Sequence, residues 1–541
     1  MKNVQILDCT LRDGGRIIDC AFPDRDIFHI ADKLSGAGID VVELGFLRDG
    51  RTVNYRGNST FFTDVDQITP FIPKGIRGTE YVAFIDYGMF DFTTLKTRSQ
   101  DSICGLRVGF TKKNYEEHYD DLLSAFYSVK ARGYDLFIQG VNSLDYSDIE
   151  LLKIVETVNM VKPVSFGIVD TYGAMYVDDV SRLYGLIDYN LDKAVAIDFH
   201  SHNNFQLSFS FAQEVIRLSR GVRNIIIDAT LDGMGKGAGN LNTELIADFL
   251  VRKMNYGYDT DIIFDAIDEH LHDLREKYHW GYSPASMLSG IFRSHPNNVI
   301  YLTQKFRLNT KDIKNILSML GEQERQRYDY NKIDKLTEEY SESTYDDSDE
   351  TAYLAEQFAD KPILILSPGK TLLTYKERIG KYIEAHNPTV ISVNFTYDEP
   401  DSYSFFANKK RYVAQAQVNS AKMIVASNIE QREKGAITVN YHSIVNRGYK
   451  LFDNSVLMLL NLLKRLRVAE IAIAGMDGFM NSTDGNYFDK SLNVERLGPQ
   501  LDEINRELYE MLENYAATVS GLCKVSLITP SIFEKLFEVS P

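Results

Sequence analysis

The feature that most constrains the fold is a regular alternation of strand-like and helix-like segments through the first part of the chain. Helical patterns separate most of the strand-like runs, for example at 114–132, 145–158, 177–189 and 205–219. The strand-like runs are 4–10, 40–46, 79–86, 103–110, 134–141, 163–170, 194–200 and 222–230. Eight strands alternating with helices over about 250 residues predict a (β/α)8 TIM barrel. A doubly wound open sheet also alternates, but usually with fewer strands, so the barrel is favoured.

The remainder of the 541-residue chain predicts a second domain. We expect an N-terminal barrel over 1–258, a helical extension over 259–337, a solvated acidic linker over 338–360 and a smaller Rossmann-like α/β domain over 361–541. Strand-like runs in this last part are 361–369, 389–395, 421–427, 435–441, 469–475 and 523–530, with helical patterns at 375–386, 451–466 and 495–519. The predicted fold class is therefore α/β in both domains.

Charge and cysteine content exclude several classes of protein. The net charge of −17 and the sequence pI near 5.2 argue against non-specific binding to nucleic acid or to an anionic membrane, because both need a basic surface. No apolar run approaches the roughly 20 residues that span a bilayer, and the N-terminus has no hydrophobic signal core. The four cysteines have no CxxC spacing, so neither a disulfide framework nor a thiolate zinc site is indicated. These features predict a cytoplasmic enzyme.

Polar residues recur where the predicted barrel strands end. The active groups of a TIM barrel come from the C-terminal ends of its strands, so these positions are the candidate site. They are Asp8, Arg12, Asp13, Glu43, Arg107, Gln139, Asp170, His200, His202 and Asn240. His200 and His202 lie two residues apart at one strand end, which places both imidazoles on the same face. Loop composition alone is the alternative explanation for this pair.

A mixed set of oxygen and nitrogen ligands can be assembled from these positions. Asp13, His200, His202 and the amide oxygen of Asn240 contain no sulfur, which suits Mg²⁺ or Mn²⁺ with positions left for water and substrate. Zn²⁺ is the second choice, because two imidazoles and a carboxylate also form catalytic zinc sites. The loop "GMGKGAGN" supplies backbone near this set or is simply a tight connection, and it lacks the end of a P-loop motif. Its Lys236 either binds a phosphate or carboxylate of a second substrate or is a solvated loop lysine.

Three motifs carry a resemblance to a known superfamily. The segments "LDCTLRDGG", "DFHSHNN" and "GMGKGAGNLNTE" resemble the signature motifs of the DRE-type TIM-barrel metallolyases. That group includes 4-hydroxy-2-oxovalerate aldolase, hydroxymethylglutaryl-CoA lyase, and the isopropylmalate and homocitrate synthases. The segment "VDTYGAM" and the helical tail look most like the 4-hydroxy-2-oxovalerate aldolase branch, and the resemblance covers roughly residues 1–336.

The resemblance implies roles for individual residues. Asp13, His200 and His202 would be metal ligands, Asn240 would stand at the position of a further ligand, and Arg12 would steady an enolate. A 2-oxo acid such as pyruvate can chelate a cation through its ketone and carboxylate oxygens, and the cation would stabilise the enolate made or used in carbon–carbon chemistry. A salt bridge of Arg12 with Asp13 or Glu43 at the barrel mouth is the alternative interpretation.

The sequence departs from the aldolase pattern at one position. The aldolase branch has a histidine two residues after Arg-Asp-Gly that serves in proton transfer, and here Arg16 stands in that place. The pKa of an arginine is far too high for a general base at neutral pH. Either another group, such as Tyr172, Tyr282 or a bound water, moves the proton, or Arg16 binds an anionic group of the acceptor aldehyde. The acyl-CoA branch expects a catalytic cysteine near the eighth strand, and "GMGKGAGN" has none.

The C-terminal half offers fewer signals. Its helical tail resembles the part of the aldolases that packs over the barrel mouth and meets a partner dehydrogenase, and His295 in this tail is expected to cap or pack. A glycine turn after a strand contains Ser367, Gly369 and Lys370, and 473–479 form another. Either these are only turns, or the domain binds a ligand such as a nucleotide or a sugar phosphate. The basic aromatic cluster "FFANKKRY" at 405–412 either meets a phosphate or balances surface charge.

We therefore predict a divalent-metal-dependent aldolase or lyase that joins or cleaves a 2-oxo acid, pyruvate being preferred, and an aldehyde. Arg12, Arg16 and Tyr172 are the catalytic candidates, and Glu43, Arg107, Gln139, Asp170 and Lys236 are the substrate-binding candidates. The two-domain arrangement resembles aldolase-like proteins of bacterial surface-sugar biosynthesis, so the aldehyde is expected to be sugar-derived. The alternatives are Claisen-type chemistry with an acyl-CoA, and a non-catalytic scaffold with a ligand-binding C-terminal domain. Small-molecule substrates are the expected partners, without nucleic acid or membrane, and the sequence leaves a homo-oligomer and a partner dehydrogenase open.

Overall fold

The first part of the chain is a closed parallel barrel. The computed structural model describes residues 3–75, 78–306, 308–343, 345–359, 361–397, 399, 401–415, 422–429, 435–480, 486–489 and 498–539. The barrel strands are β1 (Val4–Asp8), β2 (Val41–Leu47), β4 (Glu80–Asp86), β5 (Gly105–Phe110), β6 (Asp135–Gly140), β7 (Ser165–Asp170), β8 (Ala196–Ser201) and β9 (Ile225–Ala229). Each pairs in parallel with its neighbours, and β1 closes the ring by pairing with both β2 and β9. The short β3 (Phe61–Phe62) adds to β2 outside the ring.

The sequence pattern explains why these segments form strands. All seven residues of β2 are buried, as are all residues of β5, β7, β8 and β9, because a barrel strand faces side chains inside and helices outside. This confirms the prediction of a (β/α)8 barrel, strand by strand. The helix predicted over 114–132 is instead two helices, since His118 leaves helical geometry with φ −134° and ψ 35°.

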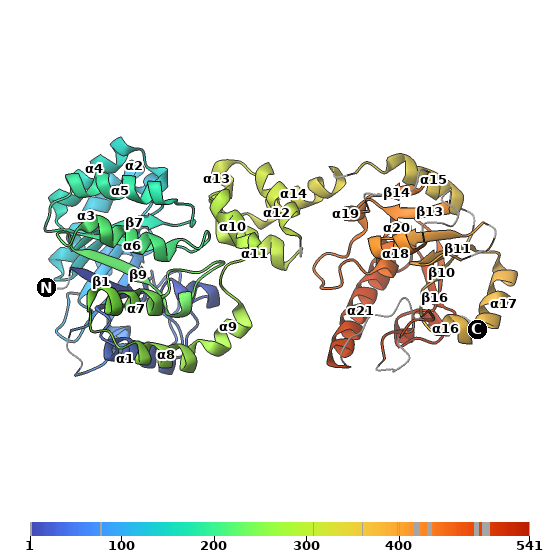
Figure 1. The fold of residues 1–541 in the computed structure, drawn as a ribbon, viewed down its shortest axis with the longest axis horizontal. Helices are drawn as coiled ribbons and strands as arrows, with labels where there is room; N and C mark the ends of the chain where they lie inside the picture. The colour runs from blue at the N-terminus through green and yellow to red at the C-terminus, as the bar shows by residue number, and fades with distance from the viewer. Residues whose placement is uncertain are drawn as a thin grey trace. The chain divides into compact units, whose positions relative to one another are not determined.

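The helices lie outside the ring of strands (Figure 1). They are α1 (Asp24–Gly36), α2 (Lys112–Glu117), α3 (Tyr119–Ala131), α4 (Asp148–Val161), α5 (Val177–Asn190), α6 (Ser208–Ser219) and α7 (Thr243–Met254). In α1 the residues Ile27, Ile30, Ala31 and Leu34 are fully buried, and their spacing of three and four residues puts them on one face. Helix α4 begins with a capping box in which Ser147 and Glu150 bond each other's backbone amides.

The region after the barrel is helical, as predicted. It contains α8 (Thr260–His270), α9 (His272–Tyr278), α10 (Pro284–Ile291), α11 (Pro296–Gln304), α12 (Thr310–Met319), α13 (Glu322–Arg325) and α14 (Tyr330–Ser343). The chain forms two compact units, residues 1–300 with 320–328 and residues 301–319 with 329–541. Helix α15 (Ser348–Phe358) falls within the segment predicted as an acidic linker. The domain boundaries drawn from the sequence remain a prediction.

The second unit contains an eight-stranded parallel sheet, which confirms the predicted second α/β domain. Its order is β14 (Ile437–Val439), β13 (Met423–Ala426), β12 (Tyr403–Phe406), β11 (Thr389–Val393), β10 (Ile363–Leu366), β15 (Glu470–Ala474), β16 (Lys524–Leu527) and β17 (Glu538–Val539). Because β10 and β15 are neighbours, the chain runs outward from β10 in one direction and later from β15 in the other. The strand order therefore reverses between them, as in doubly wound folds.

Helices of the second unit cover this sheet. They are α16 (Thr371–Thr374), α17 (Lys376–His386), α18 (Lys409–Gln415), α19 (Tyr441–Ile444), α20 (Ser455–Arg465) and α21 (Gly498–Val519). The sequence analysis missed strand β12. Phe405 and Phe406 of the basic aromatic cluster are fully buried in it, whereas Asn408, Lys409 and Lys410 after it are exposed. Parts of the predicted linker, of the strand at 421–427 and of the helix at 495–519 lie outside the described residues, namely 344, 360, 421 and 495–497. No described helix is both long and apolar enough to cross a membrane.

Candidate metal centre

The barrel opens into a cavity of about 230 Å³ at the C-terminal ends of its strands. Many residues predicted as site residues line it: Arg12, Asp13, Arg16, Gln139, Tyr172, His200, His202 and Lys236. Asp13 follows β1, His200 lies on β8 with His202 just after it, and Lys236 lies in the loop after β9. Elements at opposite ends of the barrel sequence thus contribute to one wall, because β1 pairs directly with β9.

Asp13, His200 and His202 converge on one point. Oδ2 of Asp13 lies 3.9 Å from Nε2 of His200 and 3.8 Å from Nε2 of His202. The two imidazole rings stand edge to face, with centroids 5.2 Å apart. One carboxylate oxygen and two ring nitrogens at this separation can share a divalent cation after a small contraction.

Hydrogen bonds on the far side of the rings orient these nitrogens. Nδ1 of His200 lies 3.0 Å from Oδ2 of Asp228, which is a carboxylate and can only accept, so Nδ1 carries the proton and Nε2 keeps its lone pair. His202 is held by a hydrogen bond with the backbone of Gly239. His200 therefore presents an unprotonated Nε2 toward Asp13, and Nε2 of His202 faces the same carboxylate oxygen.

The charges of the cluster also suit a cation. Burial acts to raise the pKa of Asp13, but Arg12 and the two histidines outweigh it and hold that pKa well below its usual range. Burial, together with the positive charge of Arg12, lowers the pKa of His200 to about 4, and burial lowers that of His202 to about 4 as well. The set at neutral pH is one carboxylate and two neutral imidazoles.

Asn240 contacts this cluster but does not present its oxygen to it. Its Nδ2 donates to Oδ2 of Asp13 at 3.0 Å and to the carbonyl of Met234 at 3.0 Å. Its Oδ1 is buried and has no hydrogen-bond partner among the described residues. A buried acceptor without a partner next to three candidate ligands fits a site built for a cation, since turning the amide over would direct Oδ1 toward Asp13 and its neighbours.

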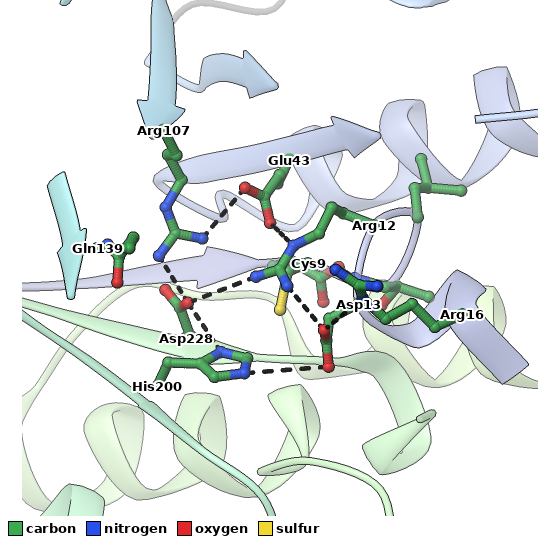
Figure 2. Close-up of polar contacts among 12 residues, drawn as sticks. Cys9, Arg12, Asp13, Arg16, Glu43, Arg107, Gln139, His200 and Asp228 are labelled. Atoms are coloured by element: carbon green, nitrogen blue, oxygen red, sulfur yellow. Dashed lines mark hydrogen bonds and ion pairs between the residues drawn. The ribbon is translucent and has the colours of Figure 1, made fainter. Parts of the chain in front are cut away.

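Arg12 sits between three carboxylates (Figure 2). Its Nε donates to Glu43 at 2.5 Å, its Nη1 donates to Asp13 at 2.7 Å, and Nη2 lies 4.0 Å from Asp228. The salt bridge considered as an alternative for Arg12 is thus present, and it fixes the guanidinium at the cavity wall. Burial acts to lower the pKa of Arg12, but Glu43 and Asp13 raise it well above its usual range, so the charge is permanent.

Glu43 and Arg107 lie beneath the cavity. Both side chains are fully buried, and Nη1 of Arg107 donates to Oε1 of Glu43 at 3.2 Å. Nη2 of Arg107 donates to Asp228 at 2.7 Å and to Asp198 at 2.9 Å. Neither Glu43 nor Arg107 lines the cavity. Glu43 holds Arg12 in place and Arg107 holds Asp228, and both of these residues line it.

Of the other predicted substrate-binding and catalytic residues, Gln139 and Tyr172 line the cavity and Asp170 does not. Gln139 lines the cavity, and its Nε2 donates to Asp198 at 2.6 Å while Oε1 is buried without a partner among the described residues. Asp170 is buried off the cavity and accepts from the amides of Ala174 and Met175. Tyr172 lines the cavity, but its hydroxyl faces the Gln326 carbonyl at 3.5 Å and burial raises its pKa to about 12.

The mouth of the cavity carries further cations. Nε of Arg16 lies 3.4 Å from Asp13, and Nη2 lies 3.5 Å from Asp86, which also accepts from Arg48 at 2.6 Å. Lys236 donates to the Oδ1 of Asn297 at 3.2 Å, and among the residues that the structure describes no carboxylate lies within 4.0 Å of its ammonium group. Burial, followed by the charge of Arg16, lowers the pKa of Lys236.

A second group of potential ligands, Cys9 with His200 and Asp228, is less suited to a cation. The thiol of Cys9 faces the carbonyl of Ala229 at 3.4 Å, and burial raises its pKa well above the usual value, so the thiolate is not formed. Asp228 is already paired with Arg107.

The sequence analysis missed three functional carboxylates. Asp86 pairs with the arginines at the mouth of the cavity. Asp198 holds Gln139 and Arg107. Asp228 orients His200. Asp198 and Asp228 interrupt apolar strand runs, "AVAIDFH" and "NIIIDAT". A charged residue inside a buried strand requires a buried partner, and this signal was available.

The second unit has its own cavity, of about 100 Å³, where the strand order reverses. Ser367 and Gly369 after β10, Asn394 after β11 and Asp477 after β15 line it, together with the first turn of α20. The side-chain oxygen of Asn394 is buried and has no partner among the described residues. The two glycine turns pack tightly, since a Cβ on Gly475 would lie 2.0 Å from the carbonyl oxygen of Ser367.

The barrel is similar in sequence to several enzymes. A family model described as HMGL-like matches residues 110–269. A 4-hydroxy-2-oxovalerate aldolase from Pelotomaculum thermopropionicum is 25% identical over 275 residues, which are 49% of this chain and 76% of that protein. A 2-isopropylmalate synthase from Pseudoalteromonas atlantica is 25% identical over 276 residues, and the match spans 48% of this chain and only half of that protein.

The solved structure of an HMG-CoA lyase from Brucella melitensis is 16% identical, with a TM-score of 0.42, and covers 51% of this chain and 100% of its own. The matches to these two relatives and to this structure extend over about half of the chain, and the family model matches a shorter part of it.

Proposed function

The barrel of this chain belongs to the DRE-type TIM-barrel metallolyases, and we propose on this premise that it makes or breaks a carbon–carbon bond between the enolate of a 2-oxo acid and an aldehyde. Pyruvate is the proposed 2-oxo acid. The observation that carries the proposal is the convergence of Asp13, His200 and His202, with both Nε2 atoms within 3.9 Å of one carboxylate oxygen, in a cavity that Arg12 also lines.

The donor set fits a divalent metal. Asp13, His200 and His202 would hold it, and Mn²⁺ or Mg²⁺ is proposed ahead of Zn²⁺ because the further donors here are amide and water oxygens. When bound, such a cation polarises the ketone of a 2-oxo acid and stabilises negative charge on its oxygen. Asn240 would become a further ligand only with its amide turned over, since Nδ2 now donates to Asp13.

Arg12 adds fixed positive charge beside the same oxygen. Glu43 and Asp13 hold its guanidinium in place, so the side chain does not have to reorganise when charge develops on the substrate. Arg12 thereby favours the enolate over the keto form of the 2-oxo acid. Arg16 is not proposed as a base, because a guanidinium does not lose its proton at neutral pH.

Arg16 and Lys236 point to an acceptor aldehyde that carries a phosphate or a carboxylate. Both line the cavity, and Lys236 has no carboxylate partner among the described residues. A cation that is half-buried without a counter-charge gains most from an anionic ligand. A sugar-derived aldehyde with an anionic group satisfies this condition.

Proton exchange at the pyruvate methyl group tests the enolisation step without requiring knowledge of the aldehyde. Incubated in D₂O with Mn²⁺, the chain is expected to exchange the methyl protons, followed by NMR, while His200→Ala should abolish the exchange. His272→Ala is the matched control, since His272 lies exposed on α9. Absence of exchange with Mn²⁺, Mg²⁺ and Zn²⁺ would overturn the proposal in favour of a non-catalytic barrel. Product analysis with acetyl-CoA distinguishes Claisen-type condensation.

For the second unit we propose a binding site for a nucleotide. The supporting observations are a cavity at the reversal of strand order, where doubly wound folds bind ligands, and the unpartnered buried oxygen of Asn394. The turn around Lys370 is not proposed as a phosphate site, because α16 after it has only four residues. Saturation-transfer NMR of the full chain with a set of nucleoside monophosphates is repeated with Asn394→Gly, which removes this oxygen and tolerates the positive φ of 65°. The wild-type chain is expected to show contacts that the variant loses. No contact with any nucleotide would contradict the assignment.

A further inference from the structure

The replacement of the expected histidine by Arg16 leaves the acceptor carbonyl without an assigned hydrogen-bond partner. Of the cavity residues that could donate a proton or a hydrogen bond, Tyr172 directs its hydroxyl to the Gln326 carbonyl. Tyr282, considered from the sequence, is half exposed, and its hydroxyl faces the sulfur of Met287 at 3.9 Å. His200 and His202 belong to the ligand set. His295 lines the same cavity and is a further candidate donor.

His295 is held firmly at the start of helix α11. Its backbone N–H donates to the carbonyl of Arg325 at 2.7 Å, and its own carbonyl accepts from the amide of Asn298 at 3.0 Å. Its ring packs against Tyr328, with centroids 4.8 Å apart. A side chain fixed by its backbone and by its ring is already organised for a directional interaction.

The hydrogen bond to Nδ1 determines which ring nitrogen carries the proton. The backbone N–H of Asn297 donates to Nδ1 of His295 at 3.1 Å, so Nδ1 is an acceptor and the proton of the neutral ring sits on Nε2. No described residue hydrogen-bonds Nε2. Burial, with the nearby charges of Lys236 and Arg16, lowers the pKa of His295 to about 4, so the ring is neutral. A neutral imidazole held in this way at a helix N-terminus can polarise a carbonyl.

We infer that Nε2–H of His295 donates a hydrogen bond to the carbonyl oxygen of the acceptor aldehyde. This inference rests on the proposed function. In the addition direction the enolate carbon bonds to the aldehyde carbon, and the C=O π pair moves onto the oxygen. The Nε2–H bond stabilises that alkoxide, and a water molecule then supplies the proton of the product hydroxyl. The hydroxide that is left is neutralised by the proton that the pyruvate methyl group released to solvent when the enolate formed. His295 is thus a catalytic residue, with a role distinct from the capping or packing expected from the sequence.

Two substitutions separate the donor at Nε2 from the acceptor at Nδ1. His295→Asn keeps an oxygen that can accept from Asn297 but removes the donor at the Nε2 position. His295→Gln places an amide N–H near the Nε2 position and serves as the conservative rescue. Two rates are measured for each: Mn²⁺-dependent methyl exchange of pyruvate, and condensation of ¹³C-pyruvate with acetaldehyde, glycolaldehyde phosphate and glyceraldehyde 3-phosphate.

The expected result is that the ratio of condensation rate to exchange rate falls about 10²–10³-fold in His295→Asn, as for loss of an oxyanion donor, and recovers in His295→Gln. A parallel loss of both rates indicates a structural role and overturns the inference. So does a wild-type chain that exchanges pyruvate protons but condenses none of these aldehydes. A wild-type chain without any exchange overturns the proposed function itself, which is a separate outcome.

Discussion

Asp228 links the candidate metal site to the buried arginines, and its replacement by asparagine is the sharpest test of that arrangement. Oδ2 of Asp228 accepts from Nδ1 of His200 at 3.0 Å and from Arg107 at 2.7 Å, while Oδ1 is buried without a described partner. An asparagine that keeps its oxygen toward His200 loses the negative charge. It also places an NH₂ group where Oδ1 now lacks a partner.

The expected cost is a loss of metal affinity. Removing a carboxylate that orients a ligating histidine weakens metal binding about 10–100-fold. That range corresponds to about 1.4–2.7 kcal/mol. The protein fold should survive, because the substitution conserves volume and shape.

Calorimetric titration of the chelator-treated protein with Mn²⁺ measures the effect. Asp198→Asn is the matched control: Asp198 is equally buried and also accepts from Arg107, at 2.9 Å, but it does not touch His200. The reasoning predicts weaker binding in Asp228→Asn and near wild-type binding in Asp198→Asn. Equal effects of the two variants on affinity would refute the role of Asp228 in orienting His200.

Three further predictions follow from the same geometry. Because the pKa values of His200 and His202 are about 4, lowering the pH from about 7 to about 5.5 should change the Mn²⁺ affinity little in calorimetry. If the imidazoles had their ordinary pKa, protonation of each would lower the affinity about tenfold. A fall in affinity of about 100-fold would therefore contradict the prediction. Arg107→Met should lower the free energy of unfolding by about 3–5 kcal/mol in urea titrations, because it leaves buried carboxylates without their shared cation; an unchanged midpoint would contradict it. Gly239→Ala should cost about 1–3 kcal/mol in the same assay, because a Cβ would lie 2.0 Å from the Gly233 carbonyl oxygen in a backbone of φ +74°; wild-type stability would show that the loop can adjust.

The barrel could be predicted strand by strand because strands covered on both faces read as continuous apolar runs. Segments such as 40–46 and 163–170 are clearly strand-like. Eight such strands alternating with helices predict one closed barrel. Asp13, His200 and His202 could be brought together for the same reason, since the C-terminal ends of parallel barrel strands meet at one opening.

What the sequence could not provide are contacts that depend on side-chain packing. Strand β12 is preceded by polar residues and followed by lysines, so Phe405 and Phe406 looked like part of a surface cluster. The environment of Glu43 depends on Arg12 from the turn after β1 and on Arg107 from β5, at sequence separations that no local pattern encodes. The orientation of His295 depends on an amide two residues further along and on Tyr328.

The pairing of the first barrel strand with the last has a consequence during synthesis of the protein. Asp13 leaves the ribosome early, whereas Asn240, its hydrogen-bond partner, is made 227 residues later. An ion bound as proposed by Asp13, His200 and His202 would therefore be captured only when the barrel is almost complete, and it would link the two ends of the barrel sequence where β1 meets β9.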